Sequence, residues 1–341
     1  MGELLIVSRA EVAEHLDYRT CIALMREAMA ALSAGGTRQS LRTIIDLDGG
    51  RAFGAMPGAM DAGAFGAKLI SVFPAAADGT PSHQGVVTLF DPANGAPVAI
   101  VDAAELTAIR TAAASAAATD SLARMDASNL AILGTGDQAF RHAEAIAEVR
   151  DLDAVAIWGR SAEKAEALRS GLDAKLGCEV RVFGNVAAAV ADADIICTTT
   201  AAPEPILSSA WVRDGTHVNA VGSSRAGPSE IDNELVRRAR FFADHREGVI
   251  RQGAEFIRAR DAGMVDETHI LGEIGDVFAG TLAGRTGPEQ VTLYKSLGSI
   301  VQDLASGWYL VGQARKLGFG RRVPACRRRS SASPRGCGAT R

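Results

Sequence analysis

The segment ILGTGDQA, residues 132–139, decides the fold of this chain of 341 residues. Its pattern G-x-G-x-x-A stands between a strand pattern and a helix pattern. In that context Gly134 makes a tight turn, Gly136 lets the backbone approach a pyrophosphate, and Ala139 lets the helix pack on the strand. The N-terminus of the helix offers N–H groups to phosphates. The segment therefore predicts a dinucleotide site.

Strand and helix patterns alternate after this segment, which predicts a parallel, doubly wound Rossmann sheet. Helices are expected at 138–149, 162–176, 185–191 and 229–238. The strand patterns between them are LAILG, AVAIW, VRVF, DIICTTT, THVNAVG and RFFAD.

The chain before this segment has a different pattern, in which several strands follow one another. The turn signal Asn94-Gly95 joins two of them. Helices are expected at 18–34 and 104–124, and a last helix at 298–317 is expected to pack back on this part. The strands are expected at 42–48, 51–57, 64–73, 85–91 and 97–102.

The length exceeds one ordinary core and indicates two domains. We predict an α/β protein with a Rossmann NAD(P)-binding domain over 120–296. A smaller α+β substrate domain is expected over 1–119 plus 297–320. Residues 321–341 hold seven arginines and no acid. With almost no apolar periodicity they are expected to be a disordered basic tail, either without function or used for docking.

Composition excludes several classes of protein. The net charge is −4 in spite of the basic tail, which argues against nucleic acid as the main partner. No apolar run reaches the roughly 18 residues of a membrane span. The five cysteines lack the spacing of metal ligands. Their odd number favours reduced thiols and a cytoplasmic location.

The end of the second Rossmann strand, Trp158-Gly159-Arg160-Ser161, indicates which cofactor binds. NAD enzymes usually carry an acid there for the ribose 2′-hydroxyl, whereas this chain has Arg160, with Lys164 one turn later. A guanidinium can pair with a 2′-phosphate. NADPH is therefore the expected cofactor. NADH stays possible because Arg160, if it is only a solvated loop residue, can swing outward.

Three cations indicate an anionic substrate. Lys68 interrupts the apolar run FGAKLISVF, where an unpaired ammonium is costly. Arg110 lies in the apolar stretch LTAIRTAAAS, and Arg42 opens the strand LRTIIDL, although Arg42 alone also fits a surface ion pair. Without a compensating acid cluster, these cations imply an α-carboxylate. His83, in PSHQG, fits a polar cleft and a surface position equally.

Ordered blocks over about residues 5–318 resemble the ornithine cyclodeaminase/mu-crystallin family. They are AKLISVFP, PSHQGVVTLFDPANGAP, LTAIRTAAAS, LGTGDQA, IWGRS, GTHVNAVGSSR, GEIGDVFAG and TLYKSLG. The resemblance implies a homodimer, in which the N-terminal domain and the last helix form the substrate site and the interface.

The resemblance also implies roles for individual residues. Arg42, Lys68 and Arg110 match the family's cations at the substrate carboxylate and active site, and Met56 and His83 match positions lining the pocket. The positions that match the family's cofactor loop, cofactor face and nicotinamide-end loop are Asp137, Gln138, Thr199, Val221, Lys295 and Ser296.

One position separates the branches of the family. Ornithine cyclodeaminases carry an Asp two residues after the glycine of AVG, and this chain has Ser224 there. A hydroxyl is no base near neutral pH without help. The chain therefore resembles the ketimine reductase branch, which includes Δ1-pyrroline-2-carboxylate reductases.

The expected function is NAD(P)H-dependent reduction of cyclic imino acids, Δ1-pyrroline-2-carboxylate or Δ1-piperideine-2-carboxylate, to L-proline or L-pipecolate. Lys68, with its pKa lowered by the other cations, would relay a proton, and Ser224 would hydrogen-bond the ring nitrogen. The alternatives are an alanine-type amino-acid dehydrogenase, an ornithine cyclodeaminase and a catalytically idle NADPH-dependent small-molecule binding protein.

Overall fold

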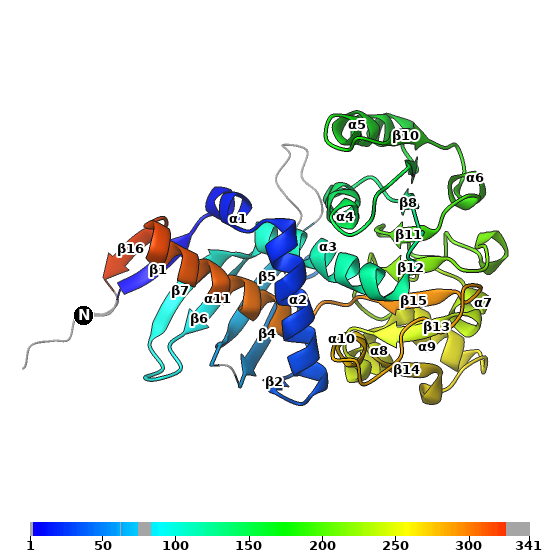
Figure 1. The fold of residues 1–341 in the computed structure, drawn as a ribbon. Helices are drawn as coiled ribbons and strands as arrows, with labels where there is room; N and C mark the ends of the chain where they lie inside the picture. The colour runs from blue at the N-terminus through cyan, green and yellow to red at the C-terminus, as the bar shows by residue number, and fades with distance from the viewer. Residues whose placement is uncertain (1–2, 62, 74–82, 325–341) are drawn as a thin grey trace, which may run out of the picture.

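A computed structural model describes residues 3–61, 63–73 and 83–324 of the chain. It contains two eight-stranded sheets. Figure 1 shows the sheets side by side, with helix α3 (Ala103–Leu122) at their junction.

The first sheet is mixed and has the strand order β16-β1-β7-β6-β5-β4-β2, with β3 paired to β4. All its pairs are antiparallel except β1 with β7. Helices α2 and α11 pack against each other and lie over one face of the sheet (Figure 1). The bounds are β1 Glu3–Val7, β2 Thr37–Gln39, β3 Thr43–Asp46, β4 Ala52–Met60, β5 Phe65–Val72, β6 His83–Phe90, β7 Pro97–Asp102, β16 Arg321–Pro324, α1 Arg9–His15, α2 Tyr18–Ser33 and α11 Ile300–Leu317.

The second sheet is parallel throughout, with the order β10-β9-β8-β11-β12-β15-β13-β14. The chain leaves β8 towards β9 on one side and later returns to β11 on the other, so the switch point lies between β8 and β11. The prediction of a doubly wound parallel sheet is confirmed. Its strands are β8 Asn129–Leu133, β9 Ala154–Trp158, β10 Glu179–Val182, β11 Ile195–Thr198, β12 His217–Ala220, β13 Arg240–Ala243, β14 Ile270–Glu273 and β15 Thr292–Lys295.

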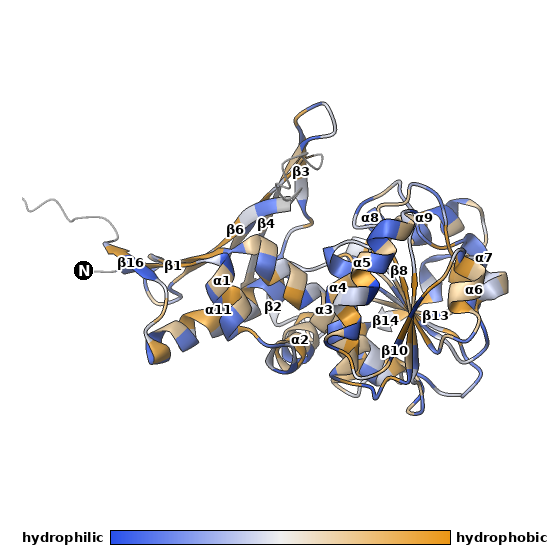
Figure 2. Ribbon diagram, turned by 90° about the horizontal axis from the view of Figure 1, so that it is seen from above, coloured by the Kyte–Doolittle hydropathy of each residue, from blue (hydrophilic) through white to orange (hydrophobic). Residues whose placement is uncertain are grey.

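Apolar strands form the core of this sheet, and Figure 2 shows them as an orange layer between helices. Ile195, Ile196 and Leu293 are fully buried, as expected for strands covered on both faces. The helices are α4 Asp137–Ala147, α5 Ala162–Asp173, α6 Val186–Val190, α7 Asn233–Arg238, α8 Arg246–Gln252, α9 Ala254–Asp261 and α10 Ile274–Phe278, with 3-10 turns η1 Ser209–Trp211 and η2 Glu267–His269.

Helix α3 joins the two sheets because its side chains are small. Ala112, Ala113, Ala116 and Ala117 have no exposed surface, and the helix packs against both α2 and α4. Its first turn is capped by Asp102, whose side chain accepts from the Glu105 N–H at 2.8 Å. The helix therefore carries Arg110 at a fixed place between the sheets.

Two predicted boundaries are wrong. Residues 321–324, expected to belong to a disordered tail, form β16 and pair antiparallel with β1. Edge pairing uses backbone N–H and C=O groups and needs no apolar periodicity; residues 325–341 lie outside the described residues. The helix expected from residue 229 begins at Asn233, because the side chain of Asp232 caps it by accepting from the Leu235 N–H at 2.8 Å.

The described residues offer neither a membrane span nor a metal site. In that part of the chain no helix is both long and apolar enough to cross a bilayer. The same residues contain no cluster of three or more His, Cys, Asp or Glu side chains that could hold a metal ion.

Candidate functional site

The carboxyl ends of β8, β11, β12 and β15 form one edge of the parallel sheet. Backbone bonds hold the following residues in a row: Thr199 N donates to Leu133 O at 2.8 Å and Ser296 N donates to Ala220 O at 3.1 Å. Val221 N donates to Thr198 O, also at 3.1 Å. The structure thus brings Gly134, Thr199, Val221 and Ser296 together at the switch point, where open α/β sheets bind ligands.

The two glycines of the loop after β8 are needed for different reasons. Gly134 has φ +137°, and a Cβ there would lie 2.6 Å from Thr199 Oγ1. A Cβ on Gly136 would meet no atom within 4 Å, and this residue is the N-cap of α4. The helix N-terminus therefore faces open space at Gly136, as close approach of a pyrophosphate requires. These residues fit a dinucleotide.

The end of β9 lies against the same loop, because a Cβ on Gly159 would collide with the side chain of Thr135. Ser161 caps α5 by accepting from the Lys164 N–H at 3.3 Å. Arg160 and Lys164 are exposed, and neither makes an ion pair with any residue that the structure describes. Two cations are thus available where the ribose of a dinucleotide would lie.

Lys68 and Arg110 meet at a single carboxylate. Lys68 Nζ on β5 lies 3.3 Å from Asp303 Oδ1, and Arg110 Nε on α3 lies 3.1 Å from the same oxygen. Lys68 also donates to Thr107 Oγ1 at 2.5 Å, and Arg110 Nη1 donates to Gln302 Oε1 at 2.7 Å. The predicted convergence of these two cations is seen in the structure.

Arg42 reaches the same region through the loop before α11. Its Nη2 donates to the carbonyl of Leu297 and, at 3.0 Å, to that of Gly298. Gly298 has φ +83°, and a Cβ there would lie 2.7 Å from Arg110 Nη1. Arg42 and Arg110 therefore both lie against Gly298, and the three predicted cations form one cluster.

The expectation that this cluster lacks a compensating acid is wrong. Asp303 has no exposed surface and is 235 residues from Lys68 in the sequence. The signal that could have found it is the pair Gln302-Asp303, which stands between the apolar residues Val301 and Leu304 on the buried face of α11.

Burial changes the chemistry of Lys68. Burial lowers the pKa of this ammonium to about 8, while the charge of Asp303 acts in the opposite direction and the charges of Arg110 and Arg42 lower it further. The direction is the expected one, but burial is a larger cause than the neighbouring cations. A lysine with this pKa can exchange a proton near neutral pH.

Four further residues were predicted to contact the substrate. The structure places three of them, and the side chain of the fourth lies outside the described residues. Met56 on β4 is the register partner of Lys68. Ser224 is half-buried in the loop after β12, next to Ser223, whose Oγ bonds the carbonyl of Pro228. Ser296 Oγ is buried with no partner among the described residues. The side chain of His83 lies outside the described residues.

The side chain of Lys295 is buried and bonded to the loop that carries Ser224. It has no exposed surface, lies 2.7 Å from Glu255 Oε2, and donates to Ser223 O at 2.6 Å. Glu230, also buried, accepts from Gly222 N at 2.6 Å. Glu230 and Glu255 were not predicted from the sequence, and the role of Lys295 towards a cofactor stays a prediction.

Gln138 connects the two halves of the site. Its Nε2 lies 3.5 Å from the carbonyl of Ala108, two residues before Arg110 on α3. Asp137, beside it, is exposed and lies 3.5 Å from Arg141. The helix that would bind the pyrophosphate therefore packs directly on α3, the helix that carries Arg110.

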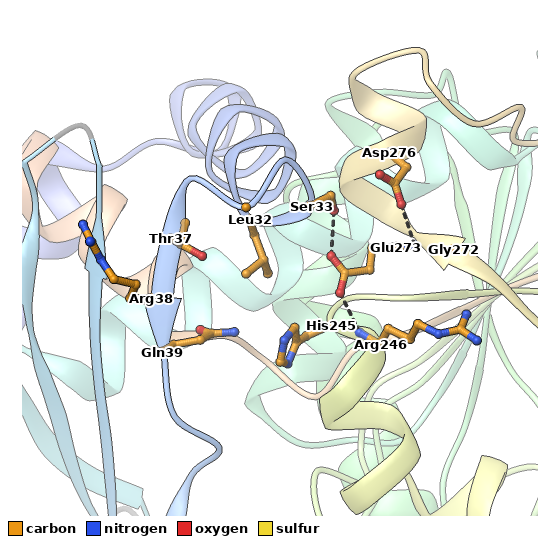
Figure 3. A pocket seen from close by; sticks show the side chains of 11 residues that line it. Leu32, Ser33, Thr37, Arg38, Gln39, His245, Arg246, Gly272, Glu273 and Asp276 are labelled. Atoms are coloured by element: carbon orange, nitrogen blue, oxygen red, sulfur yellow. Dashed lines mark hydrogen bonds between the residues drawn. The ribbon is translucent and has the colours of Figure 1, made fainter. Parts of the chain in front are cut away.

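A separate cleft of about 490 Å³ lies between α2, β2, α8 and the β14–α10 segment. Figure 3 shows Glu273 there bonded to Ser33 Oγ and to the backbone N–H of Arg246, both at 2.8 Å. Gln39 Oε1 accepts from Ser299 Oγ at 2.7 Å. These polar groups are used in joining the two sheets, and the cleft is not part of the cation cluster.

Comparisons with known proteins agree with this arrangement. The profile of the "Ornithine cyclodeaminase/mu-crystallin family" matches residues 3–317. Ketimine reductase mu-crystallin of Mus musculus is 37% identical over 307 residues, which cover 88% of this chain and 94% of the mouse protein.

Two solved structures have the same fold. The Delta(1)-pyrroline-2-carboxylate reductase of Thermococcus litoralis, in complex with NADH and L-proline, is 31% identical with a TM-score of 0.91, over 94% of this chain and 100% of that one. An archaeal alanine dehydrogenase dimer with bound NAD is 27% identical with a TM-score of 0.89, over 94% and 99%.

Proposed function

The chain belongs to the ornithine cyclodeaminase/mu-crystallin family, and from this premise we propose that it is a nicotinamide-dependent oxidoreductase acting on the C=N bond of cyclic imino acids. The substrates would be Δ1-pyrroline-2-carboxylate and Δ1-piperideine-2-carboxylate, and the products L-proline and L-pipecolate.

The observation that carries this proposal is the cluster of Arg42, Lys68 and Arg110 beside the switch point of a Rossmann sheet. Three cations with one carboxylate at ion-pair distance among the described residues leave positive charge for a substrate carboxylate. Arg110 Nη2 and Arg42 Nη1 have no acceptor within the described ranges, and they would bind the carboxylate oxygens. Such a clamp would fix C2 of the ring near the nicotinamide.

The cofactor half supports a dinucleotide and favours NADPH over NADH. When bound, the nicotinamide would supply a hydride to C2 of the imine. Gly134, Gly136, Asp137 and Gln138 would hold the pyrophosphate at the start of α4, and Thr199, Val221 and Lys295 would border the nicotinamide end. The residues that would bind the 2′-phosphate are the exposed Arg160 and Lys164, with the half-buried Ser161 between them.

Lys68 is the proposed proton source. Reduction of the imine needs one proton on nitrogen for each hydride on carbon, and a lysine with a pKa of about 8 can give it at neutral pH. Ser224, where cyclodeaminases carry an acid, would hydrogen-bond the ring nitrogen. Met56, His83 and Ser296 would line the pocket.

We also propose a cytoplasmic homodimer that binds neither nucleic acid nor membrane. Ile44, Ile45 and Leu47 on and next to β3 are 46%, 55% and 39% exposed, and Figure 2 shows β3 projecting from the body. An exposed apolar strand next to Arg42 is suited to a second copy of the chain. The free thiols of Cys21, Cys178 and Cys197 suit a reducing compartment.

The test is cofactor oxidation, followed at about 340 nm, with Δ1-pyrroline-2-carboxylate and, in parallel, with pyruvate plus ammonia. We expect turnover with the cyclic imine and a higher kcat/KM with NADPH than with NADH. Turnover with the open-chain mixture alone would replace the proposal by an amino-acid dehydrogenase. Ammonia release from ornithine without added reductant would replace it by a cyclodeaminase.

A further inference from the structure

Asp303 occupies an unusual position between the two cations of the cluster. Its Oδ1 is the acceptor for both Lys68 Nζ, at 3.3 Å, and Arg110 Nε, at 3.1 Å. Its Oδ2 is buried and has no partner among the described residues. A carboxylate that contributed only to stability would be expected to use both oxygens, because an unpaired buried oxygen keeps its desolvation cost.

We propose that Asp303 is a positioning residue of the reductase site: it keeps Lys68 charged for proton delivery and turns the free edge of Arg110 towards the substrate carboxylate. This inference rests on the proposed function. Asp303 itself has no exposed surface, so it acts through the two cations and does not touch the substrate.

The hydrogen bonds of the cluster fix the orientation of Arg110 and, within the described ranges, leave one N–H group of Lys68 without an acceptor. Arg110 uses Nε for Asp303 and Nη1 for Gln302, which fixes the plane of the guanidinium and leaves Nη2 free among the described residues. Lys68 uses two of its three N–H groups for Thr107 and Asp303. One N–H of Lys68 therefore remains to be given to the substrate nitrogen.

The charge of Asp303 is the main influence that favours the protonated form of Lys68. Burial and the two arginines all lower the pKa of the ammonium, and Asp303 raises it. Strand β4, one neighbour of β5, has no titratable side chain. Lys68 and its partners have further charged or titratable groups around them. They are Arg110 on α3, Arg42 before β3, Cys21 on α2 behind Asp303, Asp244 behind Arg42, the buried Tyr294 on β15 beside Arg110, and His83 on β6, whose side chain is outside the described residues.

The first experiment is Asp303→Asn, which keeps the shape and one oxygen acceptor but removes the charge. Since Lys68 acts as an acid, kcat should fall as pH rises through its pKa. We expect the alkaline limb of kcat to move down by about one pH unit or more, as for the loss of an opposite charge at this distance. At pH values below the alkaline limbs of the variant and of the unchanged protein, the two proteins should have similar kcat values. The KM of the variant for the imino acid should be about tenfold higher, because Arg110 loses its orientation.

A second variant should move the alkaline limb of kcat in the opposite direction. Gln302→Glu puts a carboxylate beside Arg110 with little change in shape, and it should move the alkaline limb to higher pH. The matched control is Asp194→Asn, because Asp194 is also a buried acid bonded to two arginines, Arg124 at 2.7 Å and Arg213 at 3.3 Å, away from the site. This control should leave the limb in place.

The titration of Lys68 can also be measured without turnover. The chain has five lysines, so a protein labelled with ¹³C at lysine Cε gives few signals, and the one missing from Lys68→Arg belongs to Lys68. The midpoint of this signal should lie near 8 in the unchanged protein, lower in Asp303→Asn and higher in Gln302→Glu. If Asp303→Asn does not fold, the midpoint of Lys68 in Gln302→Glu decides whether a carboxylate charge at this place on α11 controls the protonation of Lys68.

The outcomes separate this inference from the proposed function. Equal midpoints in all three proteins, or a uniform loss of kcat at every pH without movement of the limb, would overturn the role of Asp303 even if the imine is reduced. Shifted midpoints in a protein that reduces no cyclic imine would support the charge effect of Asp303 and overturn the proposed function.

Discussion

The two sides of the site handle buried charge in opposite ways. On the proposed substrate side, Lys68 and Arg110 share the single carboxylate of Asp303, and Arg42 contacts only backbone carbonyls among the described residues. On the cofactor side, Lys295 has Glu255 to itself at 2.7 Å and a carbonyl at 2.6 Å. Both lysines are buried, but only Lys68 lies in a cluster with excess positive charge.

This difference is the reason why we propose Lys68, and not Lys295, as the lysine that takes part in the chemistry. A buried cation with its own acid is satisfied before any ligand binds, so its contribution is to structure. A cluster with more cations than acids keeps unused donors and an altered pKa, both of which a ligand can exploit. The two lysines are both buried, so the number of acids beside each one, and not burial, distinguishes their expected roles.

The largest expected effect is that of Lys68→Met. Loss of the proton donor and of one cation should lower kcat/KM for the cyclic imine by roughly 10²–10⁴-fold, the usual contribution of a general acid. Far-ultraviolet circular dichroism and NADPH affinity should change little. Lys316→Met, at the exposed end of α11, is the control. A loss of folding with full kcat/KM in the surviving protein would make Lys68 a structural residue.

Lys295→Met should lower the stability of the protein, whereas Lys68→Met should lower kcat/KM. Removal of one partner of a buried pair leaves Glu255 uncompensated, at a cost of about 3–5 kcal/mol in the free energy of unfolding, measured by urea denaturation. Lys175→Met breaks the pair with Glu144, in which the lysine side chain is 55% exposed, and should cost less than about 1 kcal/mol. If Lys295→Met retains its stability but no longer reduces the imine, the contrast between the two lysines is wrong.

The pH dependence of stability sharpens the same contrast. Burial lowers the pKa of Lys68 from 10.5 to about 8 in the folded chain, so the unfolded chain binds more protons between these values. The free energy of unfolding should therefore rise with pH across this window, by roughly 3 kcal/mol at most. In Lys68→Met this rise should be absent, whereas Lys316→Met should show it in full.

The smallest expected effect concerns the cofactor. If Arg160 binds a 2′-phosphate, Arg160→Ala should raise KM for NADPH about tenfold, corresponding to ~1.4 kcal/mol, and leave KM for NADH unchanged. Arg169→Ala, on the helix α5 that follows Arg160 and bonded to Glu166, should affect neither value. Equal increases for both cofactors would remove the basis for an NADPH preference.

The cofactor half was predictable because its signals are local. Gly134, Gly136 and Ala139 stand within six residues, and the alternation of strands and helices around them has few topological solutions. The packing reason for Gly134 could not be read from the sequence, because the atom that excludes a Cβ belongs to Thr199 at the end of another strand.

The sequence by itself determined the Rossmann sheet, the position of the phosphate loop and the presence of three cations in apolar surroundings. Only the tertiary structure decided how these cations are balanced, because Asp303 reaches Lys68 and Arg110 when α11 returns to the first sheet. The same holds for Lys295, whose acid Glu255 comes from α9. Electrostatic energy depends on distance in space, and the order of residues along the chain does not contain that distance.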